Sequence, residues 1–170
     1  GALSFQTGGW RADRAESPAG GMAGMGIHMI DTLVGLCGPI TDVHCLSQRR
    51  VLTVDVDDTT SMLFRFDSGI TGYLGTIAAT TATQRVQVFG SEGTAEIRQE
   101  RYFEARPMKG EAETIDFGFF DKERAELDAF AGAITGDAPY PLPNEQAIHG
   151  VAVFEAIMEA AISGDTVAVG

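Results

Sequence analysis

The chain has 170 residues, of which 44% are hydrophobic and 21% charged, and its formal net charge is -12. This balance is typical of a globular domain with an ordinary core and excludes a disordered chain. The excess of acidic residues argues against nucleic-acid partners and anionic membranes, because both carry charge of the same sign.

The first part of the chain predicts one loop, one helix and then a series of strands. Residues 8–21 are rich in Gly, Pro and charge and indicate a loop. A helix is expected over residues 22–37, because apolar residues recur there at helical spacing and Gly38-Pro39 follows as a stop. Alternating apolar segments then predict strands at 40–52, 61–66, 70–78, 85–89 and 94–98, with weaker candidates at 101–105 and 113–117.

The last part of the chain predicts two helices. Asp121 suits the N-cap of a helix that ends at Gly136, and Asn144 suits the N-cap of a final helix that ends near Gly164. The apolar stripe of the first of these helices comprises Leu127, Phe130, Ala131 and Ile134. The inward face of the final helix is expected to carry Val151, Phe154 and Met158.

The order of these elements predicts an α+β fold. Short turns such as residues 67–69 force neighbouring strands to run antiparallel, since parallel strands need long crossovers. We therefore expect an open, mostly antiparallel β-sheet with helices packed on one face. The other face would present the apolar residues Leu63, Tyr73 and Ile77, which favours a homo-oligomer or a domain contact through the sheet.

The metal-ligating residue types form no recognisable pattern. Cys37 and Cys45 show neither a CxxC nor a Cys/His spacing, so we expect no metal site and interpret both as reduced thiols of a cytoplasmic protein. The acidic run at residues 55–58 is interpreted as a solvated turn.

No segment predicts membrane association or secretion. The most apolar stretch, residues 22–37, is interrupted by His28 and Asp31 and is too short to span a bilayer. Residues 1–10 do not have the pattern of a signal peptide. Because Gly1 is not an initiator Met, we expect the chain to have been cut, processed or tagged.

The segment that most suggests chemistry is residues 20–31, GGMAGMGIHMID. Its glycines permit either a close approach of a ligand or tight packing of a helix on the sheet. Their spacing is not GxGxxG and no strand precedes them, so a dinucleotide-binding loop is not supported. His28 is suited to proton transfer near neutral pH, or is an ordinary helical histidine, and Asp31 lies three residues on, close enough to share its face.

Several short motifs occur in an order that resembles a known family. They are Trp10-Arg11, Gly20-Gly21, GIHMID at 26–31, DDTT at 57–60, FDSG at 66–69 and VFGSEGTAE at 88–96. Together they resemble the C-terminal domain of the glucose–fructose oxidoreductase / inositol dehydrogenase / MocA-type (Gfo/Idh/MocA) family of NAD(P)-dependent oxidoreductases. The resemblance extends over nearly the whole chain.

The resemblance implies a division of labour between two domains. Residues 1–170 would form a single C-terminal substrate-binding and dimerisation domain, and the N-terminal Rossmann domain, which binds most of the NAD or NADP, would be absent from this chain. The substrate, a sugar, cyclitol or related polyol, would lie between the domains and exchange a hydride with the cofactor. In the family a Lys of the N-terminal domain and a His handle the hydroxyl proton, and His28 matches that His. Alone, this chain is expected to be inactive and to bind the cofactor weakly or not at all.

The resemblance also assigns substrate contacts. The candidate substrate-binding residues are Trp10, Arg11, Gly24 and Met25. Trp10 suits core packing or substrate stacking, and Arg11 suits either a substrate anion or a surface ion pair. Many family members carry an Asp four residues before the His, where this chain has Gly24, so the imidazole lacks that orienting partner. This departure keeps a second hypothesis open: a non-catalytic ligand-binding or dimerisation module that retains the fold.

Overall fold

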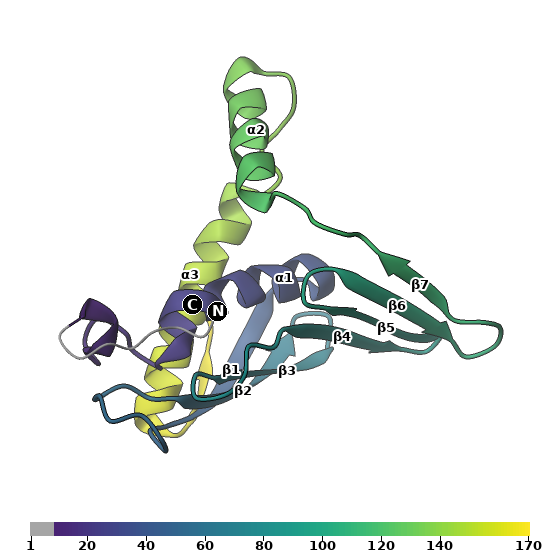
Figure 1. The fold of residues 1–170 in the computed structure, drawn as a ribbon. Helices are drawn as coiled ribbons and strands as arrows, with labels where there is room; N and C mark the ends of the chain where they lie inside the picture. Colours follow the sequence, from purple (N-terminus) through teal and green to yellow (C-terminus); the bar gives the residue numbers. More distant parts are fainter. Residues whose placement is uncertain (1–8) are drawn as a thin grey trace. The chain divides into compact units, whose positions relative to one another are not determined.

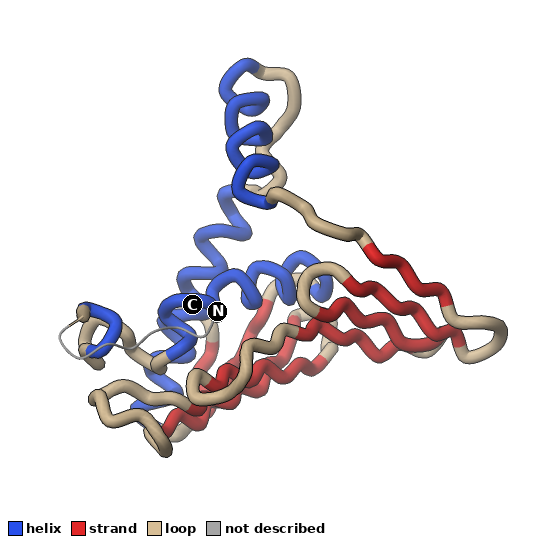
Figure 2. Tube along the Cα trace, viewed as in Figure 1, coloured by secondary structure: helices blue, strands red, loops and turns tan. Residues whose placement is uncertain are grey.

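The computed structural model describes residues 9–170 (Figures 1 and 2). Its contacts divide the chain into two compact units. The first contains the described residues up to Thr80 together with Leu142–Gly170, and the second contains Thr81–Pro141. Among the described residues no helix is long and apolar enough to cross a bilayer.

The first unit is built on a four-stranded antiparallel sheet with the strand order β3-β2-β1-β8. Its strands are β1 (Ile40–Gln48), β2 (Thr59–Phe66), β3 (Thr71–Ile77) and β8 (Thr166–Ala168). Val43 of β1 pairs with Phe64 of β2, and both side chains are buried. On β2, Met62, Phe64 and Phe66 alternate with exposed Leu63 and Arg65, as the period of two requires when one face of a sheet is covered.

Two helices cover the buried face of this sheet. The first begins as a π-helical turn, η2 (Met22–Gly26), and continues as α1 (Ile27–Cys37). It ends where Gly38 adopts φ +87° and donates its N–H to the Val34 carbonyl. The second is α3 (Asn144–Ser163), which packs on β1 and α1 (Figure 1). The core joins buried side chains of all these elements, among them Ile30, Val34, Val43, Cys45, Met62, Phe66, Val153 and Ile157.

Two predictions about α3 were wrong in detail. The N-cap position is Pro143, and Asn144 is the first helical residue. The buried face consists of Gly150, Val153, Ala156, Ile157 and Ala160. Of the residues predicted to point inward, Phe154 is half-buried and packs against the core, whereas Val151 is 55% exposed. The apolar residues of this helix lie on most of its sides, so their spacing along the sequence did not show which side is buried. The small side chains on the buried face allow the helix to approach the sheet closely.

The second unit holds another four-stranded antiparallel sheet, with the order β4-β5-β6-β7. Its strands are β4 (Arg85–Gly90), β5 (Gly93–Arg98), β6 (Tyr102–Pro107) and β7 (Glu113–Asp116), drawn in red in Figure 2. The helix α2 (Lys122–Thr135) follows. Asp121 caps it by accepting a hydrogen bond from the Arg124 amide, and Gly136 ends it in the left-handed region, as predicted. The predicted apolar stripe is solvent-exposed, with Leu127, Phe130 and Ile134 at 68%, 55% and 71%.

The prediction of an antiparallel α+β fold is therefore confirmed. The strands divide between two sheets of four instead of forming one. The short strand β8 was not predicted, because it has three residues and pairs only with β1 at the far end of the sequence.

Candidate functional site

The glycines before the candidate histidine have packing partners within the chain. Gly20 adopts φ +62°, and a Cβ atom there would lie 1.8 Å from the backbone oxygen of Asp57. A Cβ on Gly26 would lie 2.1 Å from the sulfur of Met22, whose side chain is fully buried beneath the helix. Gly20 therefore requires glycine, because its neighbour is backbone, and Gly26 packs closely on the Met22 side chain. These contacts favour close packing over a ligand-cradling loop as the interpretation of the motif.

His28 lies in the first turn of α1 with its side chain exposed. Its backbone carbonyl accepts a hydrogen bond of 2.9 Å from the Thr32 hydroxyl, and this contact does not involve the imidazole. Over residues 9–170 the ring makes no hydrogen bond or ion pair. Met25, 52% exposed, lies three residues earlier on the outward side, while Ile30 and Val34 face the core. An accessible imidazole without a partner can take a proton from a ligand or donate one.

Neither of the two nearby positions supplies a carboxylate to the His28 imidazole: Asp31 is directed elsewhere, and Gly24 has no side chain. The Oδ1 atom of Asp31 lies 3.1 Å from the Cβ position of Gly150, so this side chain faces α3. Its backbone oxygen accepts a hydrogen bond from Gln146 of the same helix. Gly24 is half-buried and lies one turn before His28. Gly24, Met25 and His28 thus occupy adjacent turns of one helix.

The other two predicted substrate residues lie in η1 (Trp10–Ala12), a short 3-10 turn. The Arg11 side chain is exposed. The prediction for Trp10 concerns a side chain that lies outside the described part of the structure.

Sequence reasoning missed the burial of the acidic pair before β2. Asp57 and Asp58 are 7% and 2% exposed, so the prediction of a solvated turn was wrong for both. The Asp58 carboxylate accepts hydrogen bonds of 2.6 to 3.0 Å from the backbone amides of Arg50, Val51 and Leu52. Burial alone would raise the pKa of Asp58, but these amides and the Thr59 hydroxyl outweigh it and lower the pKa to about 2. Asp58 therefore anchors the turn between β1 and β2.

Both cysteines are free thiols. Cys45 is buried in the core, and burial together with the charge of Asp57 raises its pKa to about 11. Cys37 is a half-buried free thiol. In the described part of the chain, no three His, Cys, Asp or Glu side chains are grouped so that they could hold a metal ion.

The Thr76 hydroxyl of β3 is buried without a hydrogen-bond partner among the described residues. It lies 3.7 Å from the Cβ position of Gly21, at the start of the His28 helix. We expect Thr76→Val to raise the free energy of unfolding by about 1 kcal/mol, because it removes an unpaired buried donor at nearly constant shape. Urea denaturation measures this, with Thr71→Val on the exposed side of β3 as the matched control. A destabilised Thr76→Val variant would show that this hydroxyl has a partner.

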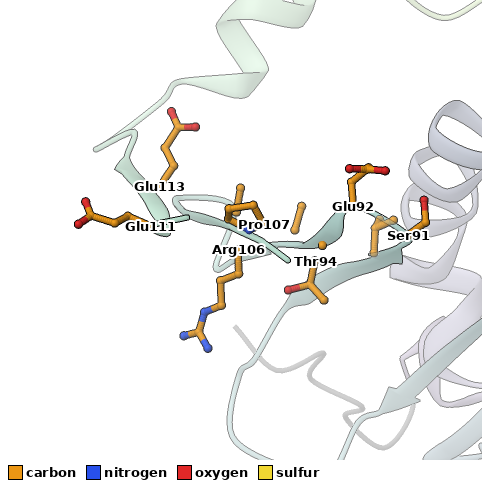
Figure 3. A pocket seen from close by; sticks show the side chains of 12 residues that line it. Ser91, Glu92, Thr94, Arg106, Pro107, Glu111 and Glu113 are labelled. Atoms are coloured by element: carbon orange, nitrogen blue, oxygen red, sulfur yellow. The ribbon is translucent and has the colours of Figure 1, made fainter. Parts of the chain in front are cut away.

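The second unit carries a shallow groove of about 520 Å³ at one end of its sheet (Figure 3). It is lined by Val88, Gly90, Ser91, Glu92, Gly93, Thr94, Ala95, Ala105, Arg106, Pro107, Glu111 and Glu113. Arg106 is already paired with Glu104. Figure 3 shows the charged ends of Arg106, Glu111 and Glu113 pointing in different directions. Their divergence does not suit a small-molecule site, which needs polar groups that converge.

Solved structures share this fold over most of the chain. An NAD-binding oxidoreductase from Klebsiella pneumoniae has a TM-score of 0.82 and 21% identity, with coverage of 95% of this chain and 54% of that one. Levoglucosan dehydrogenase in complex with NADH and L-sorbose has a TM-score of 0.85 and 17% identity, covering 99% and 55%. Aldose-aldose oxidoreductase from Caulobacter crescentus, complexed with glycerol, has a TM-score of 0.78 and 20% identity, covering 95% and 51%. The chain thus spans about half the length of each structure.

The comparison with family models identifies the chain directly. No curated protein matches the sequence. The model of the GFO/IDH/MocA C-terminal domain matches residues 2–96, which is more than half of the chain. This match agrees with the fold of the structural neighbours and with the resemblance in the sequence motifs. The chain belongs to the GFO/IDH/MocA C-terminal domain family.

Proposed function

We propose that this chain is the substrate-side domain of an NAD(P)-dependent oxidoreductase that acts on a sugar, cyclitol or related polyol by hydride transfer. The observation that carries the proposal is the exposed imidazole of His28, which has no partner among residues 9–170, on the helix of a GFO/IDH/MocA C-terminal domain. Two of the structural neighbours bear the names of sugar oxidoreductases, and one of them is complexed with NADH and L-sorbose. These names support the substrate class.

In this proposal the chain supplies proton transfer and substrate position. Oxidation of an alcohol requires loss of the hydroxyl proton as the hydride leaves, so a ring nitrogen of His28 would accept that proton or return it in reduction. Arg11 and Met25 would contact the substrate, with Trp10 as a stacking surface and Gly24 leaving room beside the imidazole. Arg11 is the cationic donor of this set and suits hydroxyl or anionic groups.

The cofactor, NAD or NADP, would be bound mainly by an N-terminal Rossmann domain, where it would supply the hydride acceptor or donor. The residues described here do not fit a dinucleotide cradle, because Gly20 and Gly26 are occupied by close contacts with Asp57 and Met22. A pyrophosphate site requires glycines whose backbone is open to the ligand.

The outer face of the sheet in the first unit supports association of two copies of the domain. Leu63, Tyr73 and Ile77 are 57%, 63% and 58% exposed. Leu63 and Tyr73 are cross-strand partners, so their side chains form one apolar surface. Apolar surface of this kind is typical of protein–protein contacts.

The alternative function is a non-catalytic ligand-binding or dimerisation module. It is favoured by Gly24, which leaves the imidazole without the carboxylate that many family members place there. Activity of the full-length protein on a panel of polyols with NAD and NADP separates the two functions. Turnover of one polyol is expected, and inactivity on all of them would favour the module.

A binding measurement tests whether the cofactor is bound mainly outside this chain. Calorimetric titration of NADH and NADPH into the 170-residue chain is expected to show no binding in the submillimolar range, because Gly20 and Gly26 of the glycine-rich segment are closed to a pyrophosphate by their contacts with Asp57 and Met22. The full-length protein provides the positive control. Submillimolar binding to this chain alone would place the cofactor site within it and contradict the proposal.

A further inference from the structure

The helix α2 exposes its large apolar side chains and keeps its small ones half-buried. Leu127, Phe130 and Ile134 are each more than half exposed, and in the described structure no residue of α2 is buried. The three side chains follow one another at intervals of three and four residues, so they lie on one side of the helix and form what we call the α2 stripe. A surface helix normally turns its large apolar residues towards a covering surface. The half-buried positions of α2 are instead Ala125, Ala129, Gly132 and Ala133.

Charged and polar groups border the α2 stripe on both sides. By the geometry of the helix, Arg124 and Asp128 lie along one side, where they form an ion pair of 3.5 Å. Glu126 lies on the other side and accepts a hydrogen bond of 3.3 Å from the Tyr140 hydroxyl. An apolar centre within a polar border is the anatomy of a protein–protein interface.

The ring at the centre of the stripe is held in one orientation. Phe130 packs edge-to-face against Tyr140, with ring centroids 6.2 Å apart and ring planes at 88°. Tyr140 is fixed in turn by its hydrogen bond to Glu126, one turn before Phe130. A ring that is already fixed loses little conformational entropy when a partner covers it, and aromatic anchors of this kind supply much of the binding energy of interfaces. The stripe is therefore prepared to bind another surface.

Two further aromatic side chains are exposed next to the start of α2. Phe119 and Phe120, 91% and 68% exposed, immediately precede the N-cap residue Asp121. Soluble proteins rarely leave a large apolar patch uncovered, and the patches that occur mark interaction sites. Since none of the described residues buries a side chain of the stripe, its partner lies outside residues 9–170.

Two partners could cover this surface: a second copy of the chain or the remainder of the same polypeptide. The helix α2 is about 21 Å long and about 10 Å wide. A stable contact between separate chains needs roughly 800 Å² on each partner, which is more than one face of such a helix offers. A covalently linked domain needs less area, because the linkage keeps its effective concentration high.

The length of the structural neighbours also favours a linked domain. Levoglucosan dehydrogenase matches 99% of this chain, so α2 lies within the shared fold. The match nevertheless covers only 55% of the dehydrogenase chain. A single copy of such a protein thus provides a further domain that can lie against α2.

We propose that the α2 stripe is the docking surface for an apolar patch of the N-terminal Rossmann domain of the same polypeptide. This inference rests on the proposed function, which supplies that domain. It goes further in naming the helix that fixes the two domains relative to each other. Hydride transfer between a substrate and a cofactor that are held by different domains requires such a fixed arrangement.

Photocrosslinking in the full-length protein identifies what covers the stripe. A benzophenone amino acid replaces Ile134, the most exposed residue of the stripe, and mass spectrometry maps the crosslinked peptides. We expect crosslinks to residues upstream of Gly1 in the same molecule. The same amino acid in place of Asp128, on the charged border, is the matched control and should give few of them. A mixture of unlabelled and isotope-labelled protein separates crosslinks within one molecule from crosslinks between two.

Thiol labelling tests the same contact without a large probe. In the full-length protein, Leu127→Cys should react with iodoacetamide about tenfold more slowly than Asp128→Cys, because the docked stripe has to open before it reacts. Adding Ile134→Asp should remove this difference, since it places a charge in the apolar contact. Adding Lys122→Asp should preserve it, because Lys122 lies away from the stripe and binds Glu100.

Neither measurement depends on activity, so the docking surface and the proposed function can fail separately. Crosslinks from position 134 to a second molecule, crosslinks confined to residues 1–170, or equal labelling of the two cysteines would each overturn the docking surface. Crosslinks to the N-terminal domain in a protein that is inactive on every polyol would overturn the proposed function and leave the docking surface established. An active protein in which the two cysteines react equally would lose the docking surface and keep the function.

Discussion

Replacing His28 by alanine in the full-length protein is expected to lower kcat about a hundredfold or more, because a positioned proton-transfer group contributes roughly 10²–10⁴-fold. The effect should fall on kcat more than on KM, since the proton moves only as the reaction proceeds. Added imidazole is expected to restore part of the activity, because the His28 side chain is exposed and its place is open to a small molecule. Steady-state kinetics of wild type and variant, with and without imidazole, measure both effects.

The fold should tolerate this change. Replacing an exposed helical residue by alanine has little effect on stability, so the free energy of unfolding of His28→Ala should stay within about 0.5 kcal/mol of wild type. Leu36→Ala is the matched control, because Leu36 is 59% exposed on the same helix and has no place in the proposed site. A loss of less than about threefold in kcat would give His28 no share in proton transfer.

Asp58→Ala is expected to lower the free energy of unfolding by about 2–4 kcal/mol, because it leaves the hydrogen bonds of a buried carboxylate unmade. Three successive backbone amides, those of Arg50, Val51 and Leu52, would lose their acceptor. Chemical denaturation measures the change. Asp55→Ala in the same turn is the control, since the Asp55 side chain is 71% exposed and forms only surface ion pairs. Equal effects of the two substitutions would contradict the anchoring role of Asp58.

The same carboxylate predicts a pH dependence of stability. The pKa of Asp58 is about 2 in the folded protein against an ordinary value of 3.8, so the folded state holds the ionised form more strongly. This preference contributes about 2 kcal/mol to the free energy of unfolding. The contribution is complete above pH 4 and disappears as the pH falls from about 4 to 2.

Comparison with Asp58→Asn isolates this contribution. Asp116 also has a pKa near 2, because it is paired with Arg101 and accepts the Gly118 amide. Its contribution is common to wild type and variant, so the difference between their denaturation curves belongs to Asp58. That difference should shrink as the pH falls from 4 to 2, and a constant difference would contradict the assigned pKa.

Local sequence was sufficient for most of the elements, with β8 the exception, and for much of the fold class. Short turns with Gly predicted antiparallel hairpins, and these are present as β2–β3 and β4–β5. Asp121 and Gly136 predicted both ends of α2. Such features depend on neighbours a few residues apart, so a single sequence carries them. The face of α3 depends instead on which side meets β1, and a helix that is apolar on several sides does not specify it.

By itself the sequence determined that a histidine stands on a helix after a glycine-rich loop, ahead of a series of hairpins. It also carried the motifs of the GFO/IDH/MocA C-terminal domain. Only the tertiary structure decided that His28 is exposed while Asp57 and Asp58, in an acidic run, are buried. The physical reason is distance along the chain. A carboxylate is stable inside a protein when distant groups supply its hydrogen bonds, and Arg14 reaches Asp57 across 43 residues.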